Sequence, residues 1–228
     1  MPYFYYDWRM ILVIPGLLLG LYAQFKVKST FDRYSRVRTK SGLTAEAAAR
    51  MLLSRGGSTN VTISRVNGSL TDHYDPSSKT LRLSDSVYGS DSVAAVGVAA
   101  HECGHALQEH DGYGLLKLRT ALVPVVNIGS SLSLPIFMAG LLFSWEPLQM
   151  VGILCFGLTL LFSLVTLPVE INASKRALGM LEGVLDAEEL QGAKAVLSAA
   201  ALTYLASVIS SALQLLRLIL ISRSRNRD

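Results

Sequence analysis

Two histidines and a glutamate with the spacing of a metal site occur in the run His101-Glu102-Cys103-Gly104-His105. On a helix, His101 and His105 lie four residues apart and so on one face, where their imidazoles can share one zinc ion. Glu102 lies one position further round, where it can reach a water beside the metal without ligating it. Zinc lowers the pKa of such a water, and Glu102 can take its proton as the water attacks a peptide carbonyl. The motif therefore predicts the two histidines as zinc ligands and Glu102 as a general base.

A third zinc ligand is not fixed by the motif. A catalytic zinc has three protein ligands and one open position, and we expect one zinc ion per chain. His110 lies on a poor face of the helix for the same metal, and the spacing of His73 does not decide whether it approaches the site. Glu170 follows a long apolar block, where a carboxylate can serve as a ligand or as an anchor at the membrane surface. The residues alone leave both interpretations of Glu170 open.

The composition is typical of an integral membrane protein. Of the 228 residues, 50% are hydrophobic and 17% are charged, whereas soluble domains carry about 25% charged residues. A net charge of +4 could suggest a nucleic-acid partner. However, the basic residues gather beside apolar blocks without interleaved aromatic residues, which indicates membrane orientation and no nucleic acid. Cys103 and Cys155 form no disulfide-scaffold pattern, and we expect both to be reduced.

Apolar blocks long enough to cross a bilayer, which takes about 20 residues, occur four times. Three of them predict transmembrane helices over residues 8–25, 121–145 and 148–169. The fourth, over residues 195–221, is either a span or a buried helix, because a crossing would place its downstream arginines outside, against the positive-inside rule. These arginines are Arg217, Arg223, Arg225 and Arg227.

The side of the membrane follows from the basic residues around the first block. Only Arg9 precedes this block, whereas six Lys and Arg residues follow it within residues 26–40. The positive-inside rule therefore places the N-terminus outside and residues 26–119 in the cytosol. We expect residues 170–194, which contain Glu170, on the same cytosolic side.

The cytosolic part is expected to combine helices with a small sheet. Thr44 can cap a helix over residues 45–55, and Ser90 or Asp91 can cap the motif helix over residues 92–109. Strands are expected at the ranges 61–66, 70–74 and 80–84. Asn67-Gly68 is a strong hairpin signal and a turn follows at residues 75–78, so the strands should form a meander. The predicted fold class is a mostly α membrane protein with three or four transmembrane helices and a small α+β zincin-like domain.

Residues 72–108, the hydrophobic hairpin after them and residues 169–177 resemble the YugP-type family of bacterial membrane zinc metallopeptidases, over nearly the whole chain. More distantly the chain is similar to membrane gluzincins such as HtpX and the CAAX prenyl endopeptidases. The resemblance implies that Glu170 is the third zinc ligand, on a helix with the pattern Glu170-x-x-Ala173. Distant relatives often carry Asp at the next position, where this chain has Ser174, which could still bond a zinc histidine.

The resemblance also implies how substrate binds. Relatives add the substrate as a strand along the sheet edge before the motif helix, and the matching stretch here ends at Ser84. The candidate substrate-binding residues are Lys79, Thr80, Leu81, Arg82 and Leu83, together with His73 and Arg176. Arg176 could pair with a carboxylate or a developing oxyanion, or it could be a basic residue of the membrane surface.

The leading interpretation is an integral protein of the bacterial plasma membrane with a zinc endopeptidase site on the cytosolic side. Its partners would be membrane or membrane-proximal protein substrates and the lipid bilayer. A non-catalytic membrane zinc protein, such as a scaffold or sensor, is the alternative, although a purely structural site has no need of Glu102. A transporter fits less well, because the first three blocks hold almost no charge and no inverted repeat is visible. The sequence carries no signal of the oligomeric state.

Overall fold

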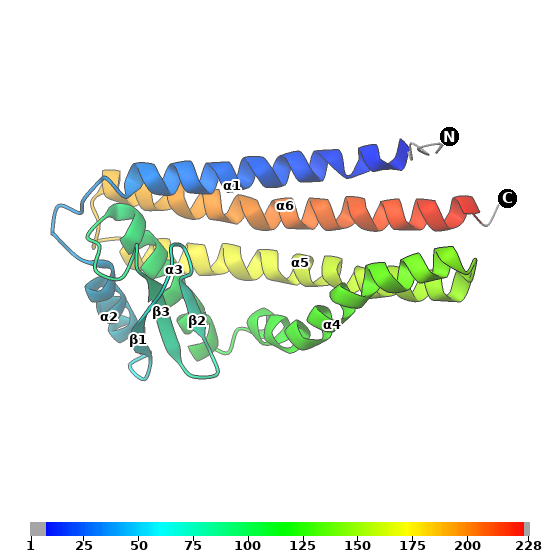
Figure 1. Ribbon diagram of the computed structural model, residues 1–228. Coiled ribbons are helices and arrows are strands. Elements are labelled where there is room, and N and C mark those ends of the chain that lie inside the picture. The colour runs from blue at the N-terminus through cyan, green and yellow to red at the C-terminus, as the bar shows by residue number, and fades with distance from the viewer. Residues whose placement is uncertain (1–7, 226–228) are drawn as a thin grey trace. The chain divides into compact units, whose positions relative to one another are not determined.

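The computed structural model describes residues 8–225 and consists of long helices and one small sheet (Figure 1). Arg227 and the residues before Trp8 lie outside this range. Within it, the chain forms two compact units. The first contains residues 8–23, 118–167 and 203–225, and the second contains residues 24–117 and 168–202.

The elements follow one another along the chain in a simple order. They are the 3-10 helix η1 (Trp8–Leu12), α1 (Ile14–Tyr34), α2 (Ala45–Arg55), β1 (Thr62–Val66), β2 (His73–Asp75), β3 (Thr80–Ser84), α3 (Val93–His110), α4 (Gly114–Leu142), α5 (Glu146–Leu181) and α6 (Ala187–Arg225). Helices α1, α4, α5 and α6 each contribute to both units.

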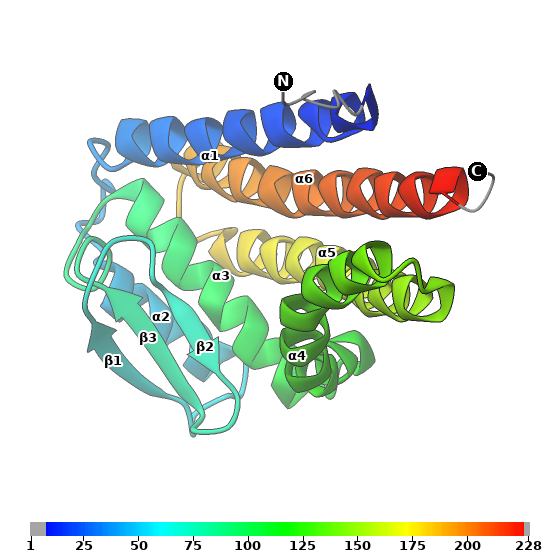
Figure 2. The ribbon, with the colours of Figure 1, turned by 45° about the vertical axis from the view of Figure 1, so that its right-hand side comes forward.

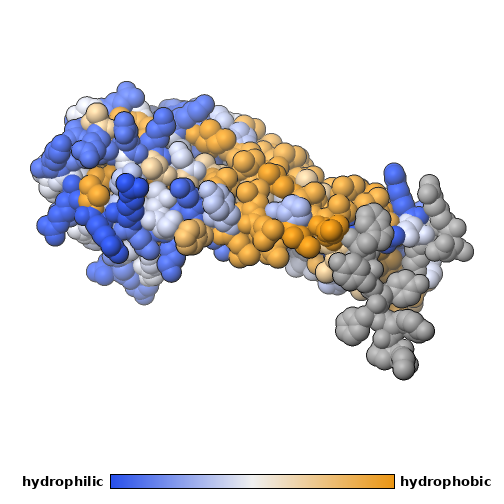
Figure 3. Space-filling view, turned by 90° about the horizontal axis from the view of Figure 1, so that it is seen from above, coloured by the Kyte–Doolittle hydropathy of each residue, from blue (hydrophilic) through white to orange (hydrophobic). Residues whose placement is uncertain are grey.

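The first unit is a helix bundle with an apolar surface. In the described residues, the segments that contain α1, α4, α5 and α6 are each long and apolar enough to cross a membrane, and hydrophobic side chains gather over its helices in Figure 3. At one contact between α1 and α6, a glycine meets a hydroxyl residue. A Cβ added to Gly16 would lie 2.9 Å from Ser210, whose hydroxyl donates to the Gly16 carbonyl at 3.1 Å. Close backbone approach of this kind is how helices associate in lipid, where the hydrophobic effect does not drive packing.

The second unit has its core around α3. Helix α2 and the buried leucines of the sheet, Leu81 and Leu83, pack against α3 in one hydrophobic cluster. Thr44 caps α2 by accepting from Ala47 N at 3.3 Å. Ser92 caps α3, so the predicted caps Ser90 and Asp91 are wrong by one or two residues. Ser92 is the residue whose backbone is still extended, which lets its hydroxyl accept from the first turn of the helix.

The sheet is not the predicted meander (Figure 2). Its strand order is β1-β3-β2, with β1 parallel to β3 and β2 antiparallel to β3. The second predicted turn does join neighbouring antiparallel strands, β2 and β3. The first does not, because β1 and β2 lie on opposite sides of β3 and make no hairpin.

Side-chain hydrogen bonds in the loop between β1 and β2 explain this difference. The carboxylate of Asp85, just after β3, accepts from Gly68 N at 3.0 Å. The carboxylate of Asp72, at the far end of the loop, accepts from Ser84 N at 2.7 Å. Both ends of the loop are therefore tied to the end of β3, so β2 reaches the other side of that strand. The Asn-Gly signal is local and does not report these longer-range bonds.

Strand β3 is consequently central rather than an edge. Its residues 80–82 pair with β2, and residues 80–84 pair with β1. The predicted free edge for an added substrate strand is wrong for residues 80–82, because both sides of these residues already carry partners. A role of residues 79–83 in substrate binding stays a prediction. The edges of this sheet are β1 and β2.

Candidate metal centre

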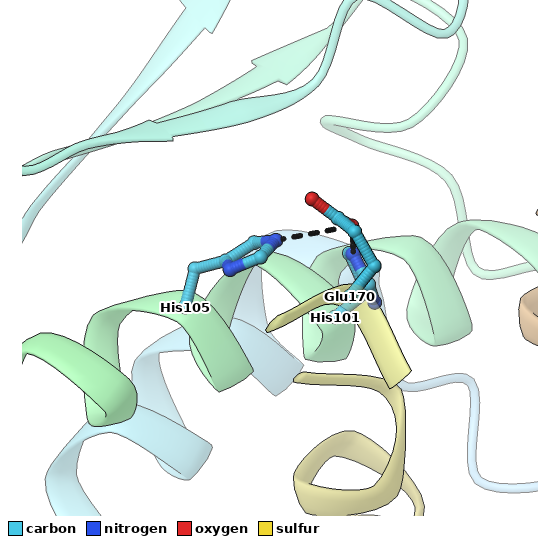
Figure 4. A group of neighbouring side chains, drawn as sticks. All are labelled: His101, His105 and Glu170. Carbon is cyan, nitrogen blue, oxygen red and sulfur yellow. Dashed lines mark hydrogen bonds and ion pairs between the residues drawn. The ribbon is translucent and has the colours of Figure 1, made fainter. Parts of the chain in front are cut away.

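Three side chains from two helices converge in the second unit (Figure 4). His101 and His105 come from α3, and Glu170 comes from α5. One donor atom from each lies within 4.8 Å of the other two. The Glu170 Oε2 atom is 3.1 Å from His101 Nε2 and 3.5 Å from His105 Nε2. A side chain from a helix 65 residues or more along the chain thus completes a cluster that the motif begins.

The donor set and its spacing fit a zinc ion. Two imidazole nitrogens and one carboxylate oxygen are a known catalytic set, which leaves a fourth position open. Donors about 2.0–2.1 Å from a tetrahedral zinc are about 3.3 Å apart, and the two Nε2 to Oε2 distances of 3.1 Å and 3.5 Å bracket that value. The side chain of Glu170 is only 2% exposed, and a carboxylate is rarely buried this deeply unless it is paired or ligates a metal.

Outer hydrogen bonds orient both imidazoles. Nδ1 of His101 lies 3.2 Å from Ser174 Oγ, and Nδ1 of His105 lies 3.0 Å from Gln108 Oε1. Because each Nδ1 has its own partner, each Nε2 is left facing the carboxylate of Glu170. Partners of this kind fix the tautomer and the ring orientation of metal-binding histidines.

A glycine allows the two helices to meet at this point. A Cβ added to Gly104 would lie 2.5 Å from the carbonyl oxygen of Ala173, which is backbone and cannot turn away. Ala173 is itself fully buried. The motif residue Gly104 and the small residue three positions after Glu170 therefore bring α3 and α5 close enough for their side chains to form one site.

The other two residues of the motif have different surroundings. Glu102 is 7% exposed, and no donor among residues 8–225 makes a hydrogen bond to its carboxylate. A buried carboxylate without a protein partner is costly, which is a mark of function. Cys103 is fully buried, with Sγ 3.7 Å from the carbonyl oxygen of Ala49 on α2. Burial raises the pKa of the Cys103 thiol, which packs as a core residue.

The electrostatics of the site favour a positive charge. Burial lowers the pKa of His105, but its hydrogen bond to Glu170 and the negative charges of Glu102 and Glu170 outweigh burial and leave the pKa raised. A site that attracts a proton in this way attracts a metal cation for the same reason. Metal binding then requires that this proton leave.

Two other predicted candidates lie away from the cluster. Nδ1 of His73 donates to Thr71 O at 2.9 Å, and Nε2 of His73 lies 3.3 Å from Arg82 Nη1. Both residues lie on the face of the sheet opposite the buried Leu81 and Leu83. His110 is the last residue of α3 and is exposed. Neither belongs to the group of three donors.

Arg176 has a carboxylate partner within the chain. Its Nη1 lies 2.5 Å from Asp111 Oδ2, at the end of α3, and its Nε donates to Asn172 Oδ1 at 3.0 Å. Arg176 thus joins α5 to the C-terminal cap of α3 in this structure.

Two polar residues beside the cluster escaped the sequence analysis. Gln108 is fully buried, and its Nε2 donates to Val169 O at 2.8 Å and to Asn172 Oδ1 at 2.9 Å. A signal was available, because Gln108 follows His105 by three residues and so shares its helix face. Asn172 carried no comparable signal, since its role depends on the packing of α5 against α3.

Two imidazoles and a buried carboxylate, with Glu102 next to His101 in the sequence, form a candidate metal site, and residues 8–225 contain four helices long and apolar enough to cross a membrane. The family described as "Putative neutral zinc metallopeptidase" matches residues 9–223, and the chain belongs to this family. It is 45% identical over 214 residues to the "Putative membrane protease YugP" of Bacillus subtilis (strain 168), across 93% of this chain and 95% of that protein. These matches confirm the resemblance to the YugP-type family. No solved structure matched the chain.

Proposed function

We propose that this protein is a membrane-embedded zinc endopeptidase that hydrolyses peptide bonds of membrane or membrane-proximal proteins. The observation that carries the proposal is the convergence of His101, His105 and Glu170 within 4.8 Å, next to the buried carboxylate of Glu102, which accepts no hydrogen bond from residues 8–225. The family name and that of the Bacillus subtilis relative support peptidase activity.

Each residue has a separate role in this proposal. His101, His105 and Glu170 hold the zinc, and Ser174 and Gln108 keep the two imidazoles in place. Zinc bound there supplies a Lewis acid that lowers the pKa of water and polarises a peptide carbonyl. Glu102 takes the proton of the attacking water on its carboxylate and passes it to the nitrogen of the leaving amine.

The position of Glu170 in the chain supports membrane-associated substrates. Helix α5 is continuous from Glu146 to Leu181, so Glu170 stands on the helix that carries the third apolar block. It follows Leu167, the last residue of this block in the first unit, by three residues, which is about 5 Å along a helix. A zinc ion held there would act on peptide segments that lie near the bilayer.

The distribution of charge and the packing of α6 support a proposed orientation in the membrane. We place the active site on the cytosolic side of the plasma membrane, with the N-terminus outside. Within the first unit, Ser222 near the end of α6 donates to Gln149 Oε1 at 2.8 Å. Gln149 lies just after the link between α4 and α5, which we place outside. This contact supports a fourth span over α6 that ends outside.

The proposal is tested with Glu102→Gln and, as a matched control, Glu182→Gln, which changes an exposed glutamate after the end of α5. The full chain is incubated with fluorescein-labelled casein and with a single-span membrane protein in the same vesicles. Glu102→Gln should keep its zinc and lose about 100-fold or more in turnover, because the general base is gone. The control should cleave like wild type, with the membrane protein preferred.

Two outcomes would contradict this account. Turnover retained by Glu102→Gln would exclude Glu102 as the base. A folded, zinc-containing wild type that cleaves neither substrate would favour a non-catalytic zinc protein.

A further inference from the structure

A cavity of the second unit lies between α1 and α6. Its volume is about 520 Å³, which is within the range of about 300–1,000 Å³ for small-molecule sites. From α1, Lys26, Ser29 and Arg33 line it at spacings of three and four residues, which places them on one face of that helix. None of the lining residues belongs to the candidate metal centre or to its outer hydrogen bonds.

The lining carries two cations and no carboxylate. Lys26 and Arg33 are both exposed, and neither forms an ion pair with any group among residues 8–225. Two basic residues further along the chain do form ion pairs, Arg38 with Asp91 and Lys40 with Asp186. Arg33 lies over the ring of Tyr34, with Cζ 5.4 Å from the ring centroid, but no carboxylate in the lining neutralises either cation, so this charge is open to an anionic ligand.

Hydroxyl groups surround the two cations. Ser29 and Thr30 come from α1, and Ser198 comes from α6. A lysine ammonium, an arginine guanidinium and hydroxyl donors together provide what the oxygens of a phosphate group need. The ligand chemistry that fits this end of the cavity is an anionic phosphate.

The other side of the cavity is apolar. Ala195, Ala199 and Leu202 of α6 line it, and Tyr34 of α1 completes the lining. On α1, Lys26 directly follows Phe25, which is 70% exposed at the end of the first apolar block. The charged residues thus stand where both helices change from polar to apolar sequence. A free phosphate has no use for that apolar lining, whereas a lipid has both a charged head and apolar chains.

We propose that this cavity binds the phosphate head group of an anionic phospholipid of the cytosolic leaflet. Lys26 and Arg33 contact the phosphate oxygens, Ser198 donates a hydrogen bond to them, and the acyl chains lie along the apolar surface of α1 and α6. Basic pockets between transmembrane helices on the cytoplasmic side are known to bind anionic head groups. The site is independent of the proposed peptidase activity.

The test measures lipid binding by native mass spectrometry of the full chain in an uncharged detergent. Dioleoylphosphatidylglycerol should bind wild type more tightly than dioleoylphosphatidylcholine does. Lys26→Gln/Arg33→Gln should weaken phosphatidylglycerol binding by about 20- to 30-fold, at about fivefold for each charge. Ser198→Leu, which fills the cavity without a change of charge, should weaken it as well.

The matched control is Lys28→Gln/Lys194→Gln. It removes the same charge from exposed residues of α1 and α6 that do not line the cavity. Equal losses in the control and in Lys26→Gln/Arg33→Gln would mean diffuse surface attraction and would overturn the proposal. Binding of glycerol 3-phosphate as tight as that of phosphatidylglycerol would also overturn it, because the site would then be one for a free anion. Thermal unfolding of each variant checks that it is folded.

Discussion

The side-chain oxygen of Gln108 lies 3.0 Å from Nδ1 of His105, while the amide nitrogen of the same side chain donates to the carbonyl of Val169. One buried residue therefore orients a histidine of α3 and holds the backbone of α5 next to Glu170. The candidate metal centre depends on this link, because its donors come from helices that no local sequence signal brings together.

Gln108→Ala should weaken zinc binding about 10- to 100-fold, because the ring of His105 loses its outer partner. The variant should also lose about 1–3 kcal/mol of stability from the hydrogen bonds left unmade. Competition with a chelator measures zinc affinity. Gln149→Ala is the control, since Gln149 is an equally buried and hydrogen-bonded glutamine of the first unit. An unchanged zinc affinity for Gln108→Ala would show that His105 needs no such support.

Gly104→Ala should separate the two helices that carry the donors. The added Cβ would lie 2.5 Å from Ala173 O, and overpacking of this kind costs about 1–3 kcal/mol. We expect a lower thermal midpoint together with loss of zinc. Gly179→Ala on α5 is the control, because its Cβ meets nothing within 4 Å and alanine is the better helix former. A Gly104→Ala protein with full zinc content and stability would contradict the close approach.

The sequence predicts local features of this protein better than distant ones. Helix α2 and its Thr44 cap follow the predicted bounds, and α3 begins within one residue of its prediction, because capping and helical spacing are properties of neighbouring residues. The sheet order was missed, since the bonds of Asp72 and Asp85 to distant backbone decide which strands pair.

In the candidate site, too, the sequence predicts the local features and misses the distant ones. The spacing of His101 and His105 puts them on one helix face, but nothing in that spacing identifies a donor on another helix. The family resemblance pointed to Glu170, and the structure places its carboxylate beside both rings. Asn172 could not be anticipated, because its contact with Gln108 exists only once α5 packs on α3.

The end of α6 should be accessible from outside the cell. In a background with both cysteines replaced by serine, Arg223→Cys should react with a membrane-impermeant maleimide in intact cells, because Ser222 bonds Gln149 near the outer link. Lys28→Cys, placed after the first apolar block, should react only once the membrane is permeabilised. Protection of Arg223→Cys in intact cells, followed by labelling after permeabilisation, would instead mean that α6 does not cross.

The zinc content of the purified full chain tests the central claim most directly. Mass spectrometry of the metal in detergent-purified protein should find about one zinc per chain in wild type. The content should fall sharply in Glu170→Ala and stay at the wild-type level in Glu182→Ala, which removes an exposed glutamate from the segment after α5. Folded wild-type protein without zinc, or unchanged zinc in Glu170→Ala, would contradict a metal centre built from His101, His105 and Glu170.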